Sequence, residues 1–202
     1  MIMPRTYSRK QKTTGQDSRA LPDKSGPEAV SQRDAYAQEL VEMGKQFSRL
    51  VVLDADLSAV SKGCLFRDKY PERHVQVGVA EQNMIGIAAG MAQIGYIPIV
   101  HSLAAFITGR AYDQIRMALC YSGLNVKIVG LHAGVTLGLD GATHQTAEDI
   151  ALMCALPGMC VLSPADAQQT RDLLPQLIEL QSPAVQPSSG EFRSSVKAAT
   201  SR

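Results

Sequence analysis

Glu81 is the residue of this chain whose position most suggests chemistry. It follows a short apolar run, HVQVGV at 74–79, and it opens a segment rich in small residues, with Gly86 and Gly90 among several alanines. Open α/β sheets place their ligand crevices at the carboxyl ends of strands, where a strand gives way to a helix. A carboxyl group among valine, methionine and isoleucine side chains is poorly solvated, and it is suited to share a proton with a ligand nitrogen. The alternative is a carboxylate that only complements the dipole of the helix it begins.

Two histidines and an aspartate bracket a second candidate region. His132 ends an apolar run, His144 follows later in the chain, and Asp140 lies between them in a loop with three glycines. Glycines permit unusual backbone angles, so this loop can fold back over a site. A lone histidine at a strand end is usually structural, but this pair is less easily dismissed. No H-E-x-x-H or similar ligand spacing occurs, and we therefore expect no metal site in this chain.

Apolar runs rich in β-branched residues alternate with helical segments from residue 28 onward. This alternation is typical of a mostly parallel sheet that helices cover on both faces. We therefore predict a doubly wound α/β fold. The expected strands are 50–57, 74–79, 97–103, 125–132 and 159–163, and the expected helices are 28–46, 81–94, 109–121, 146–155 and 166–180.

The two ends of the chain lack such a pattern. Residues 1–27 are polar and basic with interrupting prolines and glycines, and residues 185–202 are rich in serine without a hydrophobic period. Segments of this composition cannot bury enough apolar area to offset the entropy lost on ordering. We predict a disordered basic arm at 1–27, one domain at 28–184 and a disordered tail at 185–202. A transit peptide is the alternative interpretation of the arm.

The composition is that of an ordinary globular protein. The 202 residues carry a formal net charge of +1, are 45% hydrophobic and 19% charged, and include no tryptophan. These values favour neither a polyanion-binding surface nor a platform for stacking bases, so we expect no nucleic-acid partner. No apolar run is long enough to span a membrane. The four cysteines lack C-x-x-C spacing, and three of them lie in apolar contexts, which favours buried thiols in a reducing compartment. No secretory signal is evident, and we expect a cytoplasmic location.

Three blocks of sequence together resemble the pyrimidine-binding module of the transketolase family, which uses thiamine diphosphate. They are VGVAEQNMIGIAAGMA, HSLAAFITGRAYDQIR and NVKIVGLHAGVTLGLDGATHQTAEDIALMCALPGMCVLSPAD, and they occur in the family's order. The resemblance extends over residues 33–183, and its specificity is high because separate motifs agree.

The resemblance implies how this chain would contact the cofactor. Glu81 matches the activating glutamate, whose carboxyl group bonds N1′ of the aminopyrimidine ring and thereby helps the exocyclic nitrogen to remove the thiazolium C2 proton. Phe106 matches an aromatic residue that packs on the pyrimidine ring, and Arg110 lies on a segment near the cofactor. Asp56 and Leu57 match a segment beside it. On residue type alone, Phe106, Arg110 and Asp56 have structural alternatives as a core, a helix-surface and a turn residue, respectively.

The resemblance also implies contacts with a sugar substrate. His144 matches a catalytic histidine that bonds the donor sugar near its reacting carbonyl, and His132 matches one that meets the acceptor sugar or its phosphate. Asp140 matches an acid that contacts the sugar. Arg33 aligns with an arginine that binds sugar phosphate in some members, whereas Ser163 stands where those members carry a second such arginine.

The family holds the cofactor's diphosphate and Mg²⁺ in a different module, whose GDG motif this chain lacks. The resemblance therefore implies a separate diphosphate-binding transketolase subunit that holds Mg²⁺ and shares thiamine diphosphate. This chain would form a dimer or join a heterotetramer, and the pair would transfer a two-carbon ketol unit between sugars. Two alternatives stay open. One is a subunit like 1-deoxyxylulose-5-phosphate synthase, and the other is a truncated, non-catalytic remnant or assembly subunit, because the family's pattern ends near Ala184.

Overall fold

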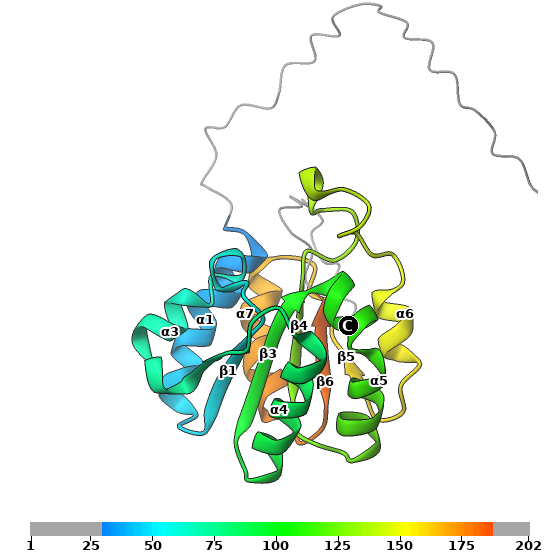
Figure 1. Cartoon of the computed structure of the whole chain (residues 1–202). Coiled ribbons are helices and arrows are strands. Elements are labelled where there is room, and N and C mark those ends of the chain that lie inside the picture. Colours follow the sequence, from blue (N-terminus) through cyan, green and yellow to red (C-terminus); the bar gives the residue numbers. More distant parts are fainter. Residues whose placement is uncertain (1–29, 188–202) are drawn as a thin grey trace, which may run out of the picture.

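Six parallel strands form the centre of this chain in a computed structural model that describes residues 30–187 (Figure 1). Their order across the sheet is β2-β1-β3-β4-β6-β5, and every neighbouring pair is parallel. The strands are β1 (Leu50–Asp54), β2 (His74–Gln76), β3 (Ile97–Leu103), β4 (Lys127–Leu131), β5 (Cys160–Val161) and β6 (Ala184–Pro187). The predicted doubly wound α/β fold is confirmed.

Helices cover both faces of this sheet. The longer ones are α1 (Gln32–Gln46), α4 (Glu81–Gln93) and α7 (Ala167–Glu179). The shorter ones are α2 (Ser58–Ser61), α3 (Cys64–Lys69), α5 (Tyr112–Gln114), α6 (Asp149–Cys154), the 3₁₀ turns η1 (Pro71–Arg73) and η4 (Gly138–Asp140), and the π-helical segments η2 (Ala105–Arg110) and η3 (Ile115–Tyr121). In Figure 1, α1, α3 and α7 lie on one side of the sheet, and α4, α5 and α6 lie on the other.

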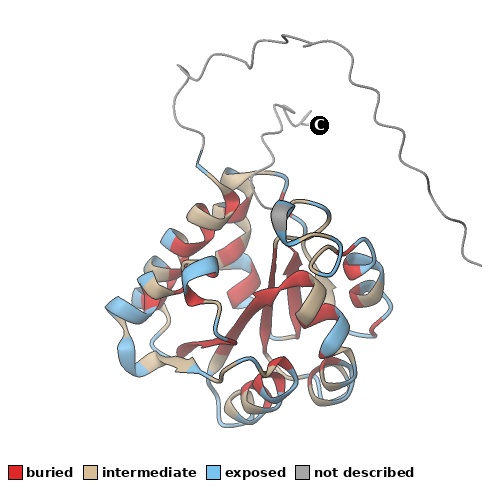
Figure 2. Cartoon of the chain, turned by 45° about the horizontal axis from the view of Figure 1, so that its top comes forward, coloured by how far each residue is buried: buried red, intermediate tan, exposed pale blue. Residues whose placement is uncertain are grey.

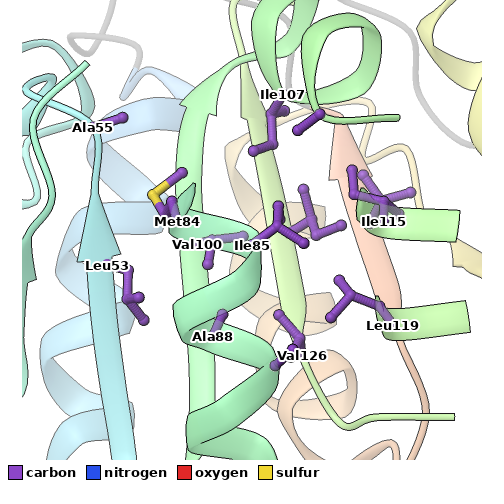
Figure 3. Packing of buried hydrophobic residues seen from close by; sticks show 14 of the residues in the cluster. Leu53, Ala55, Met84, Ile85, Ala88, Val100, Ile107, Ile115, Leu119 and Val126 are labelled. Carbon is purple, nitrogen blue, oxygen red and sulfur yellow. The ribbon is translucent and has the colours of Figure 1, made fainter. Parts of the chain in front are cut away.

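Alternating strand residues build a separate hydrophobic core on each face, because successive side chains of a strand point to opposite sides. Val51 and Leu53 of β1 pack in the core that includes α4, and Leu50 and Val52 pack in the core that includes α1 and α7. Figure 3 shows Met84, Ile85 and Ala88 of α4 among the residues of the first core. Figure 2 shows the buried strands between helices whose outer faces are exposed.

The strand order creates a switch point at β1. The chain passes from β1 to β2 on one side of it and then crosses back to β3 on the other. Such a switch point opens a crevice at the carboxyl ends of the strands. All the predicted site residues except Arg33 lie in the segments that follow β1, β2, β3 and β4, so they share this edge.

Strand β6 contradicts part of the predicted tail. Residues 184–187 lie between β4 and β5 and are buried, so the prediction of disorder from residue 185 is wrong for 185–187. The segment AVQP carries only a weak strand signal of its own. It is ordered because both neighbours supply partners, as when Ala184 N–H donates to the Val126 carbonyl at 3.2 Å. The predicted arm at 1–27 and residues 188–202 lie outside the described residues.

The segment after β3 also differs from the predicted helix at 109–121. It begins at Ala105 and consists of two π-helical stretches around the short α5. Within the first stretch, Thr108 Oγ1 donates to the Ala104 carbonyl at 2.8 Å, and such a side-chain bond competes with regular helix bonding.

Two further expectations concern membrane contact and the cysteines. Within residues 30–187, every helix is too short or too polar to cross a membrane. The four cysteines are free, but Cys154 is exposed and the other three are only partly buried, so the prediction of buried thiols is wrong.

Candidate functional site

Glu81 is the first residue of α4, and its carboxylate is buried at the carboxyl edge of the sheet. Only 2% of the residue is exposed, although its neighbour Val79 is 73% exposed. The preceding residue, Ala80, has no side chain that could cap the helix. Glu81 is the acidic residue of the first turn. A negative charge at this position is favoured by the helix dipole.

Arg110, at the end of η2, is the counter-ion of this carboxylate. Its Nη1 donates to both carboxylate oxygens of Glu81, each at 2.9 Å. The Arg110 side chain is 48% exposed, so one partner of the pair is buried and the other meets solvent. Gln82 adds a second link between α4 and the end of η2, because its Nε2 donates to the Arg110 carbonyl at 3.1 Å.

Two aromatic contacts extend this ion pair toward the loop after β4. The guanidinium carbon of Arg110 lies 4.6 Å from the centroid of the Phe106 ring. The Phe106 ring in turn meets the His144 imidazole edge-on, with centroids 5.0 Å apart. His144 Nδ1 and Thr143 Oγ1 are 2.9 Å apart. The structure thus brings Glu81, Arg110, Phe106 and His144 into one continuous line of contacts.

A cleft of about 440 Å³ opens beside this line. It is lined by the start of α4 and the residues before it, together with Arg110. The cleft combines one buried carboxylate, one long cationic side chain and an apolar rim at Val79. Such a set suits a flat heterocycle that presents a ring nitrogen to a carboxyl group and an apolar edge to the rim.

His132 and Asp140 lie at the same edge of the sheet, in the segment that follows β4. His132 follows β4 directly and has a backbone φ of 53°, in the left-handed region that is uncommon for residues other than glycine. Asp140 is exposed in η4. The base of their loop is closed by Thr146 N–H, which donates to the Gly134 carbonyl at 3.1 Å.

Asp56, Leu57 and Arg33 lie around the end of β1. Asp56 is exposed and has a φ of 65°, and the Leu57 N–H donates to Asp54 Oδ1 at 2.6 Å. Arg33, near the start of α1, places Nη1 at 3.4 Å from the Val60 carbonyl. These three residues therefore border the switch point from the side of β1 and α1.

The sequence did not predict a buried polar group at the switch point. Asp54 and His101 face each other in the register of β1 and β3, and both are completely buried. Asp54 Oδ2 lies 2.6 Å from His101 Nε2, and His101 Nδ1 lies 3.3 Å from the Tyr36 hydroxyl. A histidine within a mostly apolar strand, beside a strand that ends in aspartate, is the signal that could have revealed this pair.

Burial and charge shape the titration of this group. Burial alone would raise the pKa of Asp54, but His101 and the Leu57 and Gln76 donors outweigh it and lower that pKa to about 2. Burial, assisted by the negative charge of Asp54, raises the pKa of Tyr36 well above its usual range. Ser61 Oγ lies 3.3 Å from His101 Nε2, the same nitrogen that Asp54 binds. This geometry is not that of a serine nucleophile with a histidine base, in which the acid and the serine engage opposite ring nitrogens.

Comparison with known proteins gives one family over most of the chain. The family described as transketolase, pyrimidine binding domain, matches residues 28–186. The 6-deoxy-6-sulfo-D-fructose transketolase subunit SqwH of Clostridium sp. (strain MSTE9) is 46% identical over 146 residues, which are 72% of this chain and 45% of that protein. An apulose-4-phosphate transketolase subunit of Phocaeicola vulgatus is 36% identical over 155 residues, which are 76% of this chain and 49% of that protein.

A solved structure described as a split gene transketolase, inactive beta4 tetramer, has the same fold. It matches with a TM-score of 0.74 and 42% sequence identity, over 84% of this chain and 55% of that chain. This chain spans about half the length of the curated relatives that it matches.

Proposed function

This chain belongs to the family of transketolase pyrimidine-binding domains, and we propose that it is the pyrimidine-binding part of a split transketolase. Together with a second subunit, it would transfer a two-carbon ketol unit between sugars with thiamine diphosphate as cofactor. The observation that carries this proposal is the buried Glu81 carboxylate at a cleft, linked through Arg110 to the Phe106 ring.

The residues at the cleft fit the pyrimidine half of thiamine diphosphate. When bound, this cofactor supplies the nucleophilic carbon and the electron sink that ketol transfer needs. Glu81 would bond the pyrimidine ring nitrogen N1′, and Phe106 would pack against the ring. Both Glu81 oxygens accept from Arg110 in this structure, and each keeps a second lone pair for a ring nitrogen. The half-exposed Arg110 side chain could shift to admit the ring without disturbing the core.

The residues of the loop after β4 would hold the sugar. Thr143 engages Nδ1 of His144, so Nε2 is the nitrogen that would bond a sugar oxygen near the reacting carbonyl. His132, at the end of β4, would meet the acceptor sugar. Asp140 and Arg33 would contact sugar hydroxyls and a sugar phosphate, respectively. Asp56 and Leu57 would border the cofactor from the end of β1.

The diphosphate and Mg²⁺ would be held by a separate transketolase subunit, with this chain as a dimer or in a heterotetramer. Two findings support this division. Relatives with similar sequence are named as transketolase subunits. The similar solved structure is described as an inactive tetramer of a split-gene enzyme. A cytoplasmic location belongs to the same proposal, and the free cysteines are compatible with it.

Reconstitution tests this function. The chain is combined with the diphosphate-binding subunit of a split transketolase from the same organism, and ketol transfer is measured with thiamine diphosphate and Mg²⁺. We expect transfer by the mixture and none by the chain alone. Glu81→Gln should abolish it, whereas Glu42→Gln, which alters an exposed carboxylate on α1 paired with Lys45, should not. Transfer by the chain alone, or unchanged kcat in Glu81→Gln, would overturn the proposal.

A further inference from the structure

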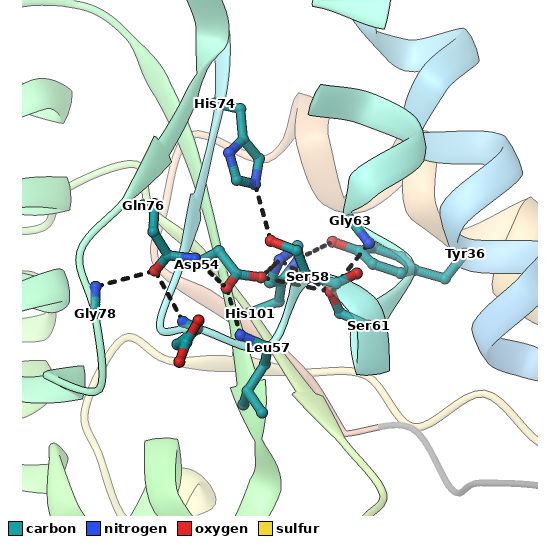
Figure 4. A network of polar contacts seen from close by, with 11 residues as sticks. Tyr36, Asp54, Leu57, Ser58, Ser61, Gly63, His74, Gln76, Gly78 and His101 are labelled. Atoms are coloured by element: carbon teal, nitrogen blue, oxygen red, sulfur yellow. Dashed lines mark hydrogen bonds and ion pairs between the residues drawn. The ribbon is translucent and has the colours of Figure 1, made fainter. Parts of the chain in front are cut away.

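Gln76, the last residue of the edge strand β2, binds two loops at once through its side-chain amide (Figure 4). Its Oε1 accepts from the Asp56 N–H at 2.8 Å and from the Gly78 N–H at 3.0 Å. Its Nε2 donates to Asp54 Oδ1 at 3.2 Å. One side chain therefore joins the segment after β1 to the segment after its own strand.

Each loop has a residue in the left-handed backbone region at the point where Gln76 holds it, and of the two only Asp56 needs support there. Asp56 has a φ of 65° and Gly78 has a φ of 72°, both in the left-handed region. For a residue with a side chain, such as Asp56, this conformation is uncommon and costs free energy unless the surroundings fix it. The hydrogen bond to the Asp56 N–H is one such constraint.

The other end of this arrangement is anchored in the core. Asp54 Oδ1 accepts from both Gln76 and the Leu57 N–H, and Asp54 Oδ2 faces His101 of β3. Figure 4 shows the chain of contacts from Gly78 and Gln76 through Asp54 to His101 and Tyr36. Because Asp54 and His101 are fully buried, the amide of Gln76 is held against a fixed support rather than against another exposed side chain.

We propose that Gln76 is a positioning residue, which clamps the 77–80 loop, whose Val79 and Ala80 line the cofactor cleft, to the 55–57 loop. One loop carries Asp56 and Leu57, and the other leads directly into Glu81. This inference rests on the proposed function, because it assumes that the cleft receives the thiamine pyrimidine. Gln76 would act through the backbone of both loops, without touching the reacting atoms.

Gln76→Met tests the clamp without the cofactor, because methionine keeps the length of the side chain and removes its polar atoms. Amide hydrogen exchange of the full chain, followed by NMR, should become about tenfold faster at Asp56 and Gly78, since each amide loses its acceptor. Exchange at Ile128 in β4 should stay unchanged. The matched control is Gln168→Met on α7, which removes one exposed amide that donates to Asp172 and should alter neither loop.

The second readout uses the complex with the diphosphate-binding subunit. Glu81 keeps its place in α4 and its bonds to Arg110, so Gln76→Met should raise the KM for thiamine diphosphate about fivefold to tenfold and change kcat less than about twofold. Unchanged exchange at Asp56 and Gly78 would overturn the clamp. Faster exchange with an unchanged KM would overturn its role in cofactor binding. A wild-type complex that binds no thiamine diphosphate would instead overturn the proposed function, while the exchange data would still decide whether Gln76 joins the loops.

Discussion

The Glu81–Arg110 ion pair should respond very unevenly to removal of its two partners. Glu81 is 2% exposed and the Arg110 side chain is 48% exposed. Arg110→Met leaves a buried carboxylate without its counter-ion, whereas Glu81→Gln leaves a cation that water can reach. The cost of an unpaired group depends on whether solvent can replace the lost partner.

These exposed fractions set the expected loss of unfolding free energy in each variant. Removing one partner of a fully buried pair costs about 3–5 kcal/mol, and partial exposure of Arg110 reduces this to about 1–3 kcal/mol for Arg110→Met. Glu81→Gln should cost less than about 1 kcal/mol, because glutamine still accepts one hydrogen bond and Arg110 becomes hydrated. In a domain of this size, each kcal/mol lowers Tm by about 2–4 °C.

The assay is urea unfolding at pH 7 of the wild type, both single variants and the double variant, with the same m-value required throughout. Because Glu81→Gln removes the buried carboxylate that Arg110→Met leaves without a counter-ion, the double variant should be more stable than Arg110→Met alone. The coupling energy should be about 1–2 kcal/mol. Equal losses in the two single variants, or additive losses within about 0.5 kcal/mol, would refute the reasoning from burial.

Three further predictions concern pH and the sheet. Asp54 is held ionised in the folded state, so the wild type should lose stability as the pH falls from 3.8 toward about 2, and Asp54→Asn should lack this slope in acid unfolding. Burial lowers the pKa of Lys127 to about 8, although the nearby Cys160 opposes this shift. The Lys127 ammonium group therefore loses its proton at a lower pH in the folded chain than in the unfolded chain. Urea unfolding should therefore show stability rising from pH 8 toward 10.5 in the wild type but not in Lys127→Met; a flat wild-type profile would contradict this. A chain that ends at Ser182 should lose cooperative thermal unfolding, because it lacks β6, whereas a chain that ends at residue 190 should keep it; folding of both would show that β6 is dispensable.

The long, regular elements of this fold could be predicted because their sequence patterns are strong. Strand β3 has the predicted bounds, and α4 begins at the predicted residue, Glu81. The apolar runs indicate burial on both faces of the sheet. Of the small-residue segment, Ala88 and Ala89 are buried in the core, whereas Gly86 and Gly90 face open space. Strand β6 could not be predicted, since its order comes from β4 and β5 rather than from its own four residues.

The candidate site was predicted as a set of residues but not as a set of contacts. Strand ends alone place Glu81, Phe106 and His144 at one edge. The hydrogen bond from Arg110 to Glu81 depends on where the end of η2 lies relative to the start of α4, and no spacing in the sequence predicts that position. The Asp54–His101 pair likewise depends on the register of β1 against β3.

Exchange of the thiamine diphosphate C2 proton for deuterium, followed by NMR in the reconstituted complex, tests the role of Glu81 most directly. If Glu81 bonds the pyrimidine and promotes removal of that proton, the wild-type complex should exchange it at least about 100-fold faster than the Glu81→Gln complex, which is the usual scale of acid–base catalysis. The Glu42→Gln complex should match the wild type. Exchange at the wild-type rate in Glu81→Gln would contradict the account.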